Sequence, residues 1–306
     1  MTRIASATLE TPSLGLAERI AARLGDYLEL AKPRIVALEL ITVAVAAYVA
    51  APRGLDAWVL LHAVVGAALI AASAGAANQW LERGTDARMR RTAARPLPAG
   101  RLGSGEVLLL AAVSLVLGTV QLALLVNLLT AVLGIATWLI YVAVYTPLKV
   151  VTPINTAVGA VSGALPILMG WTATGAPLDA RAFALAGVLF MWQFPHFMAI
   201  AWLHREDYAR AGQRMLTVVD PTGLRAGAQA VIAALVLIPV SLIPALTPTS
   251  ASPSVYCGWA IALGAAQFAA AVAFLLTRNE TSARRLLRAT LLYLPCWMAL
   301  LVMLAI

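Results

Sequence analysis

Long stretches without a single charged side chain dominate this sequence. They lie at residues 57–81, 107–148, 150–178, 182–203, 226–277 and 289–306. A transmembrane helix needs about 20 mostly apolar residues, so the two longest stretches each have room for two spans. The stretch 35–52, interrupted only by Glu39, adds another span. The sequence therefore predicts an all-α membrane bundle of about nine transmembrane helices over residues 35–306.

Composition supports a membrane protein and excludes an ordinary soluble domain. Hydrophobic residues make up 61% of the 306 residues and charged residues only 12%, whereas soluble domains carry about 25% charged residues. The formal net charge of +8 is explained by orientation and by contact with anionic lipid, so it does not require nucleic acid as a partner.

The basic residues predict which way the bundle faces. Short cytoplasmic loops retain Lys and Arg. With the N-terminus inside, 20 of the 22 basic residues fall on the inner side and only Arg53 and Arg181 lie outside. We therefore predict a cytoplasmic N-terminus, with the termini on opposite sides.

Residues 1–34 form a separate N-terminal segment. They lack the continuous apolar core of a signal peptide, and their acidic residues argue against a mitochondrial transit peptide. A helix here would place one apolar stripe on a single face, which suits a helix lying on the cytoplasmic membrane surface. The stripe consists of Leu16, Ile20, Leu24, Tyr27 and Ala31. A disordered tail is the alternative.

A first polar segment, residues 78–101, follows the second span. If that span continues as a helix, Asn78, Glu82 and Asp86 recur every four residues and line one face. Oxygen ligands of this kind hold Mg²⁺ when the ion also binds a substrate phosphate. The arginines beyond them suit the remaining phosphate charge. The segment taken alone is equally compatible with a solvated loop that obeys the positive-inside rule.

A second polar segment, residues 203–225, lies on the same predicted side. It carries Glu206, Asp207 and Arg210 just after the sixth span. Within that span stands His196, and a polar group at membrane depth usually faces a cavity or a partner. His196 is therefore a site candidate, with a packing residue between helices as the alternative.

Two further polar positions remain open in the sequence. Lys149 belongs to a short hydroxyl-rich turn between Pro147 and Pro153, which prevent a continuous helix. Glu39 lies inside the first span, where a structural hydrogen bond and a substrate contact are equally plausible.

Four segments together resemble a known family. They read NQWLERGTD (78–86), MRRTAARPLPAG (89–100), YTPLKVVTPINTAVGAVSGALP (145–166) and WQFPHFMAIAWLHREDYARAGQRML (192–216). This combination is similar to the protohaem IX farnesyltransferases, which belong to the intramembrane aromatic prenyltransferases. The resemblance runs from about Lys32 to the last span.

The resemblance implies a metal site and roles for individual residues. The superfamily motif N-x-x-x-D-x-x-x-D falls on Asn78, Glu82 and Asp86, with Glu in place of the middle Asp. The second acidic motif has several spaced aspartates in the superfamily, whereas here Asp207 is the position that carries over. These four residues would hold Mg²⁺, and further residues would bind the substrates. Those residues are Arg91, Arg95 and Lys149 for the diphosphate and His196 for haem.

The resemblance also implies a reaction. The farnesyl group of farnesyl diphosphate would be transferred to a vinyl group of haem b, and water would complete a hydroxyethylfarnesyl substituent to give haem O. The expected location is a bacterial cytoplasmic (inner) membrane, where haem A synthase or terminal oxidase assembly would use the product.

Two other classes of protein deserve comparison. A transporter would predict an inverted repeat with matched broken helices, and no such similarity between the halves is seen in the sequence. A prenyltransferase for a quinone or chlorophyll precursor would keep the first acidic motif but normally not RT..RPL or REDYARAG.

Overall fold

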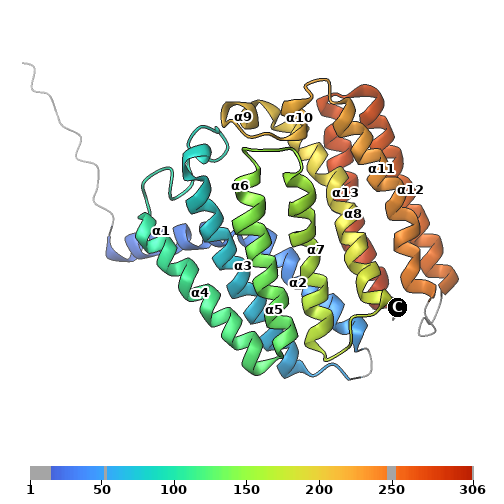
Figure 1. Ribbon diagram of the computed structural model, residues 1–306, viewed down its shortest axis with the longest axis horizontal. Helices are drawn as coiled ribbons and strands as arrows, with labels where there is room; N and C mark the ends of the chain where they lie inside the picture. Colours follow the sequence, from blue (N-terminus) through green and yellow to red (C-terminus); the bar gives the residue numbers. More distant parts are fainter. Residues whose placement is uncertain (1–14, 52–53, 247–252, 305–306) are drawn as a thin grey trace, which may run out of the picture.

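The structure is a computed structural model that describes residues 15–51, 54–246 and 253–304. This part of the chain contains nine helices long and apolar enough to span a membrane, as predicted. The spans are α2 (Pro33–Ala50), α3 (Ala57–Asp86), α4 (Ser104–Leu125), α5–η1–α6 (Leu128–Leu148), α7 (Asn155–Ala173), α8 (Ala180–Leu203), α11–η2 (Leu224–Leu246), α12 (Pro253–Thr277) and α13 (Glu280–Met303). They stand side by side in one bundle (Figure 1).

Helix α3 extends well beyond its apolar stretch. Asp56 caps its N-terminus by accepting a hydrogen bond from the Trp58 backbone N–H at 2.8 Å. Its 30 residues correspond to about 45 Å at 1.5 Å per residue, which exceeds the roughly 30 Å of the bilayer hydrocarbon. The last turns of α3, which carry the beginning of the first polar segment, therefore reach the end of the bundle.

The fourth span is irregular where it approaches α3. It changes from α-helix to a π-helix, η1 (Leu139–Tyr145), and ends in the short α6 (Thr146–Leu148). The helical path resumes at Asn155, so the break expected between Pro147 and Pro153 is confirmed. The π-helix was not predicted; such distortions often occur at functional sites.

Close contact between α2 and α7 depends on a glycine. A Cβ atom at Gly170 would lie 2.1 Å from the Val43 carbonyl oxygen, a distance that no side chain can occupy. The backbone of α7 therefore lies directly against α2.

Helix α1 (Leu16–Ala31) runs across the bundle helices (Figure 1). Ion pairs from Arg23 to Glu106 at 2.6 Å and from Arg101 to Asp26 at 2.8 Å attach it to the rest of the molecule. Its exposed apolar stripe is formed by Leu16, Ile20, Leu24 and Leu28. Tyr27, expected on that stripe, is instead half-buried and donates a hydrogen bond to Glu106. Placement of this stripe in the membrane surface stays a prediction.

The last helix begins earlier than its apolar stretch. Asn279 caps α13 by accepting a hydrogen bond from the Ser282 backbone N–H at 2.9 Å, so the helix starts at Glu280 and not near residue 289. The extra turns carry Arg284, Arg285 and Arg288. The apolar stretch read from hydropathy ends at these charges, whereas the helix continues through them.

The polar segments meet at one end of the bundle. The end of α3, α6, α9 (Arg205–Arg210), α10 (Leu216–Val219) and the junction of α12 with α13 all lie there (Figure 1). Residues 83–101, 203–225 and 278–288, which lie in these segments or in the loops between them, carry most of the basic residues. A single polar end is what two cooperating polar segments require.

Candidate active site

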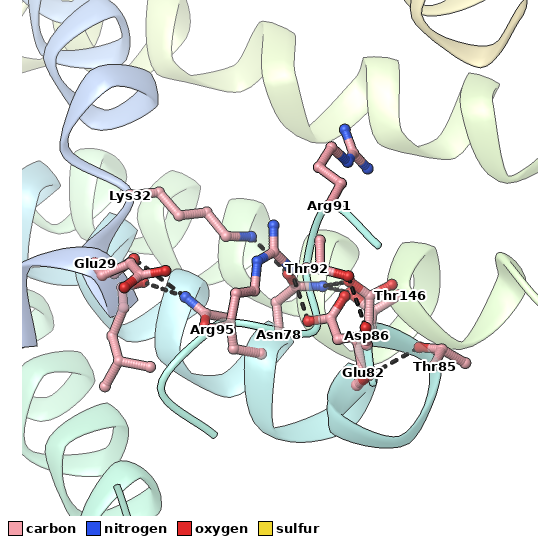
Figure 2. A network of polar contacts seen from close by, with 12 residues as sticks. Glu29, Lys32, Asn78, Glu82, Thr85, Asp86, Arg91, Thr92, Arg95 and Thr146 are labelled. Carbon is pink, nitrogen blue, oxygen red and sulfur yellow. Dashed lines mark hydrogen bonds and ion pairs between the residues drawn. The ribbon is translucent and has the colours of Figure 1, made fainter. Parts of the chain in front are cut away.

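The final turns of α3 place three oxygen-bearing side chains together. Asn78 and Asp86 are fully buried, and Glu82 is 8% exposed. The Asn78 amide donates to Glu82 Oε2 at 3.0 Å and to Thr146 Oγ1 at 2.9 Å. The expectation that these three residues share one helix face is confirmed, and Figure 2 shows them side by side.

Each of these side chains contacts a different basic residue. Lys149 Nζ lies 2.8 Å from Glu82 Oε1, and Arg95 Nη1 lies 2.7 Å from Asp86 Oδ2. Lys32, just before α2, donates to Asn78 Oδ1 at 2.6 Å (Figure 2). Lys32 and Lys149 from distant parts of the chain, and Arg95 from the loop after α3, thus converge on the end of α3.

A small cavity of about 100 Å³ lies among these groups. Six of the sequence-predicted site residues line it, namely Asn78, Glu82, Asp86, Arg91, Arg95 and Lys149. The Arg91 guanidinium lies over the Tyr208 ring, 5.6 Å from its centroid, and Nη2 is 3.4 Å from the Tyr208 hydroxyl. The first polar segment and the turn at Lys149 therefore build one site with part of the second segment.

Asp207 is not among the residues that line this cavity. Its carboxylate pairs with Arg210 within α9, while Tyr208, Gln213 and Met215 are the lining residues from the second segment. Over the described ranges, no three His, Cys, Asp or Glu side chains are grouped so that they could hold a metal ion. In this arrangement, the first acidic motif is the one that faces the cavity.

The cavity has an excess of positive charge. Four basic side chains line it against the two carboxylates of Glu82 and Asp86. Burial lowers the pKa of Lys32 to about 7, and the neighbouring charge of Lys149 acts in the same direction. Burial also opposes the charge of Lys149, but attraction to Glu82 outweighs it and raises the pKa of Lys149. This balance suits an anionic group that brings several negative charges, as a diphosphate does.

The oxygen donors fit a hard divalent cation. Asp86 Oδ1 is buried and has no hydrogen-bond partner in the described part of the chain. With Glu82 and the Asn78 side-chain oxygen, it supplies two carboxylates and one amide, a donor set that Mg²⁺ accepts when phosphate oxygens and water complete its shell. Among the described residues that line the cavity there is no histidine or cysteine. The softer donors are limited to the thioethers of Met89 and Met215.

His196 lies apart from this cavity, on α8. Its ring is stacked on that of Trp192, with 4.9 Å between centroids, and its Nδ1 is 3.0 Å from Thr290 Oγ1. The Thr290 hydroxyl already donates to the Leu287 carbonyl at 2.7 Å, so it accepts from His196. The proton therefore sits on Nδ1, which leaves the lone pair of Nε2 available to a ligand.

Several cavity residues were missed in the sequence. Lys32, Tyr145, Tyr208 and Gln213 line the cavity, and Thr146 binds Asn78 from its edge. Tyr145 and Thr146 belong to a quoted motif, so their hydroxyls offered a signal. The sequence around Lys32 offered little signal, because the position of this side chain depends on a left-handed backbone conformation (φ 52°) between α1 and α2.

Comparison with protein families and curated relatives shows what this chain is similar to. The model of the UbiA prenyltransferase family matches residues 40–301. Protoheme IX farnesyltransferase of Solibacter usitatus is 42% identical over 279 residues, which cover 88% of this chain and 95% of that protein. Protoheme IX farnesyltransferase of Rhodopirellula baltica is 43% identical over 274 residues, covering 88% of this chain and 96% of the relative.

Solved structures share the fold at low sequence identity. A digeranylgeranylglyceryl phosphate synthase has a TM-score of 0.72 at 17% identity and covers 93% of this chain and 99% of its own. A UbiA homologue from Archaeoglobus fulgidus bound to GPP and Mg²⁺ has a TM-score of 0.68 at 16% identity, with 91% of this chain and all of that chain covered. The fold of the described part of the chain is therefore one that solved structures also adopt.

Proposed function

Because the chain belongs to the UbiA prenyltransferase family, we propose that it transfers the farnesyl group of farnesyl diphosphate to a vinyl group of haem b, with addition of water, to give haem O and diphosphate. The observation that carries this proposal is identity of 42–43% to protohaem IX farnesyltransferases over 88% of the chain. The buried, basic cavity with its two carboxylates is the site where a diphosphate would bind.

The cavity residues divide into two groups by their chemistry. Asn78, Glu82 and Asp86 would hold Mg²⁺ through their oxygens, and Asp207 is a fourth candidate because it precedes Tyr208, which lines the cavity. A bound Mg²⁺ would neutralise part of the diphosphate charge. The A. fulgidus homologue bound to GPP and Mg²⁺ supports a divalent metal in this fold.

The basic side chains would stabilise the leaving diphosphate. Arg91, Arg95 and Lys149 already point their charges at the cavity, so little reorganisation is needed when negative charge develops there. When the substrate enters, the ion pairs Lys149–Glu82 and Arg95–Asp86 would be partly replaced. Lys149 and Arg95 would contact phosphate, and Glu82 and Asp86 would contact the metal. Breaking of the allylic C–O bond leaves the farnesyl group as a cation.

The apolar bundle serves the second half of the reaction. It gives room to a long isoprenoid and a flat porphyrin, and it keeps bulk water from the farnesyl cation before the vinyl group attacks. We propose His196 as a haem contact, because its Nε2 lone pair is free and its ring is held by Trp192 and Thr290.

The proposed setting is the cytoplasmic membrane of a bacterium. The nine apolar helices indicate a multi-pass membrane protein, and the positive-inside rule orients the cavity end towards the cytoplasm. Haem A synthase or terminal oxidase assembly would then receive the haem O.

Membranes containing the expressed protein provide the test. They are incubated with farnesyl diphosphate, haem b and Mg²⁺, and the haem products are followed by mass. We expect hydroxyethylfarnesyl haem in these membranes and none in membranes from cells without the gene. Farnesylation of a quinone precursor in place of haem b would contradict the proposed acceptor.

A further inference from the structure

Glu39 on α2 faces the inside of the bundle. Thr42, Val43 and Ala46 lie three, four and seven residues after it and therefore share its helix face. They are 3%, 1% and 1% exposed, and the Val43 carbonyl lies against α7 at Gly170. A carboxylate thus occupies the inward face of a helix that is otherwise packed into the core.

Glu39 also lies deeper than the diphosphate cavity. It follows Lys32 by seven residues, or about 10 Å along a helix, and Lys32 contacts Asn78 at 2.6 Å. Lys32 Nζ also lies 3.4 Å from the hydroxyl of Tyr141 in the irregular fourth span. Glu39 is therefore on the side of the cavity that leads into the apolar bundle.

No described residue donates a hydrogen bond to Glu39 or forms an ion pair with it. The neighbouring Thr42 hydroxyl donates to the Leu38 carbonyl of its own helix and not to Glu39. The side chain is only half-buried, unlike the residues that share its face. No structural hydrogen bond therefore explains this carboxylate, and an ionisable group at membrane depth is costly and usually marks a functional site.

The proposed reaction contains a step that releases a proton inside the bundle. The vinyl π electrons form the new C–C bond to the farnesyl group, which leaves a positive charge on the carbon attached to the pyrrole ring. A water oxygen bonds to that carbon, and one O–H bond must then break and release a proton. The diphosphate cavity lies nearer the end of the bundle, so a carboxylate deeper in the bundle is better placed than the cavity carboxylates to accept this proton.

We propose that Glu39 is this acceptor. Its carboxylate holds the attacking water by a hydrogen bond and takes the proton as the C–O bond forms, so the carboxylate becomes a carboxylic acid and the product becomes an alcohol. The proton later passes to solvent. This role rests on the proposed farnesyl transfer and assigns the hydration step to one residue.

The test compares products and not only rates. Without the base, the porphyrin-side cation can lose a proton from carbon and give a farnesylated alkene, one water lighter than hydroxyethylfarnesyl haem. Glu39→Gln protein in lipid nanodiscs is given farnesyl diphosphate, haem b and Mg²⁺, and diphosphate release and product masses are both measured. A general base contributes about 10²–10⁴-fold, so we expect the ratio of alcohol to alkene to fall at least about 100-fold, with diphosphate release largely retained.

Two variants control the experiment. Glu39→Asp keeps a carboxylate and should restore much of the alcohol. Glu280→Gln changes an exposed glutamate at the start of α13 and should leave the ratio unchanged. A wild-type product ratio in Glu39→Gln would overturn the proposal, and so would loss of diphosphate release in a folded variant. Absence of any farnesylated haem from the wild-type protein would instead refute the proposed function on which the role depends.

Discussion

Asp86 combines complete burial with a carboxylate oxygen that has no partner in the described part of the chain. We expect Asp86→Ala to reduce farnesyl transfer by about 10²–10³-fold, the usual cost of removing a group that stabilises developing charge. The assay is product formation in membranes as a function of Mg²⁺ concentration.

Asp207→Ala is the matched comparison for this prediction. Its carboxylate pairs with Arg210 and does not line the cavity, so its loss should cost less than that of Asp86. Near-normal turnover of Asp86→Ala, with an unchanged requirement for Mg²⁺, would contradict the metal assignment. Glu82→Asp should be milder than Asp86→Ala, because it restores the superfamily's usual residue and keeps the charge beside Lys149.

His196 offers a second prediction at the scale of a single side chain. Because Nδ1 donates to Thr290, Nε2 is free to bind the haem iron. His196→Ala should therefore weaken haem binding and change the haem absorption spectrum, while farnesyl diphosphate binding stays largely intact. Imidazole added in solution should restore part of the spectrum.

A histidine at the other end of the bundle serves as the control. His62 contacts Gln121 and Trp58, and His62→Ala should leave the haem spectrum unchanged. If His196→Ala binds both substrates normally, His196 is a packing residue between α8 and α13, which is the alternative raised by the sequence.

The sequence was informative about residues wherever helix periodicity decides the geometry. Asn78, Glu82 and Asp86 could be placed together because a four-residue spacing keeps side chains on one face. Lys32 and Tyr141 could not be placed. The position of the first depends on a left-handed residue between helices, and that of the second on a π-helical turn, neither of which has a clear sequence signal.

At the scale of helices, Gly170 controls how closely α2 and α7 can approach. A methyl group there would lie 2.1 Å from the Val43 carbonyl oxygen, so the two helices must separate. We expect Gly170→Ala to destabilise the folded protein by about 1–3 kcal/mol, as overpacking typically does. Gly258→Ala is the matched control on α12, because no atom lies within 4 Å of its Cβ position.

The measurement is the midpoint of unfolding of each variant in detergent. A lower midpoint for Gly170→Ala but not for Gly258→Ala would support the role of this contact. Equal midpoints would show that α2 can shift without loss of stability. Glu39 lies on the same helix, so such a shift would also be expected to alter the ratio of alcohol to alkene products.

Elements were predictable by hydropathy but their ends were not. All nine spans were expected, yet α3 and α13 include charged turns outside the apolar stretches. The reason is physical: hydropathy reports contact with lipid, whereas helix ends depend on capping groups such as Asp56 and Asn279. The extra turns of α3 matter most, because they carry the candidate metal ligands.

At the scale of the whole molecule, the active-site proposal requires that all polar segments face one aqueous side. The structure gathers the end of α3, the turn at Lys149 and α9 at one end of the bundle (Figure 1), and the positive-inside rule predicts that this end is cytoplasmic.

Single cysteines can test both statements after Cys257 and Cys296 are replaced by alanine. Cysteines at positions near Arg90, Lys149, Arg210 and Arg285 should react with a membrane-impermeant maleimide only in inside-out vesicles. Cysteines at Asp56 and Gly175, in the connections at the opposite end, should react only in right-side-out vesicles. Reversal of every label would overturn the orientation alone, since the site would still be assembled. Labelling of Arg90 and Arg210 from opposite sides would separate α3 from Tyr208, and the cavity that supports the proposed diphosphate site could not exist.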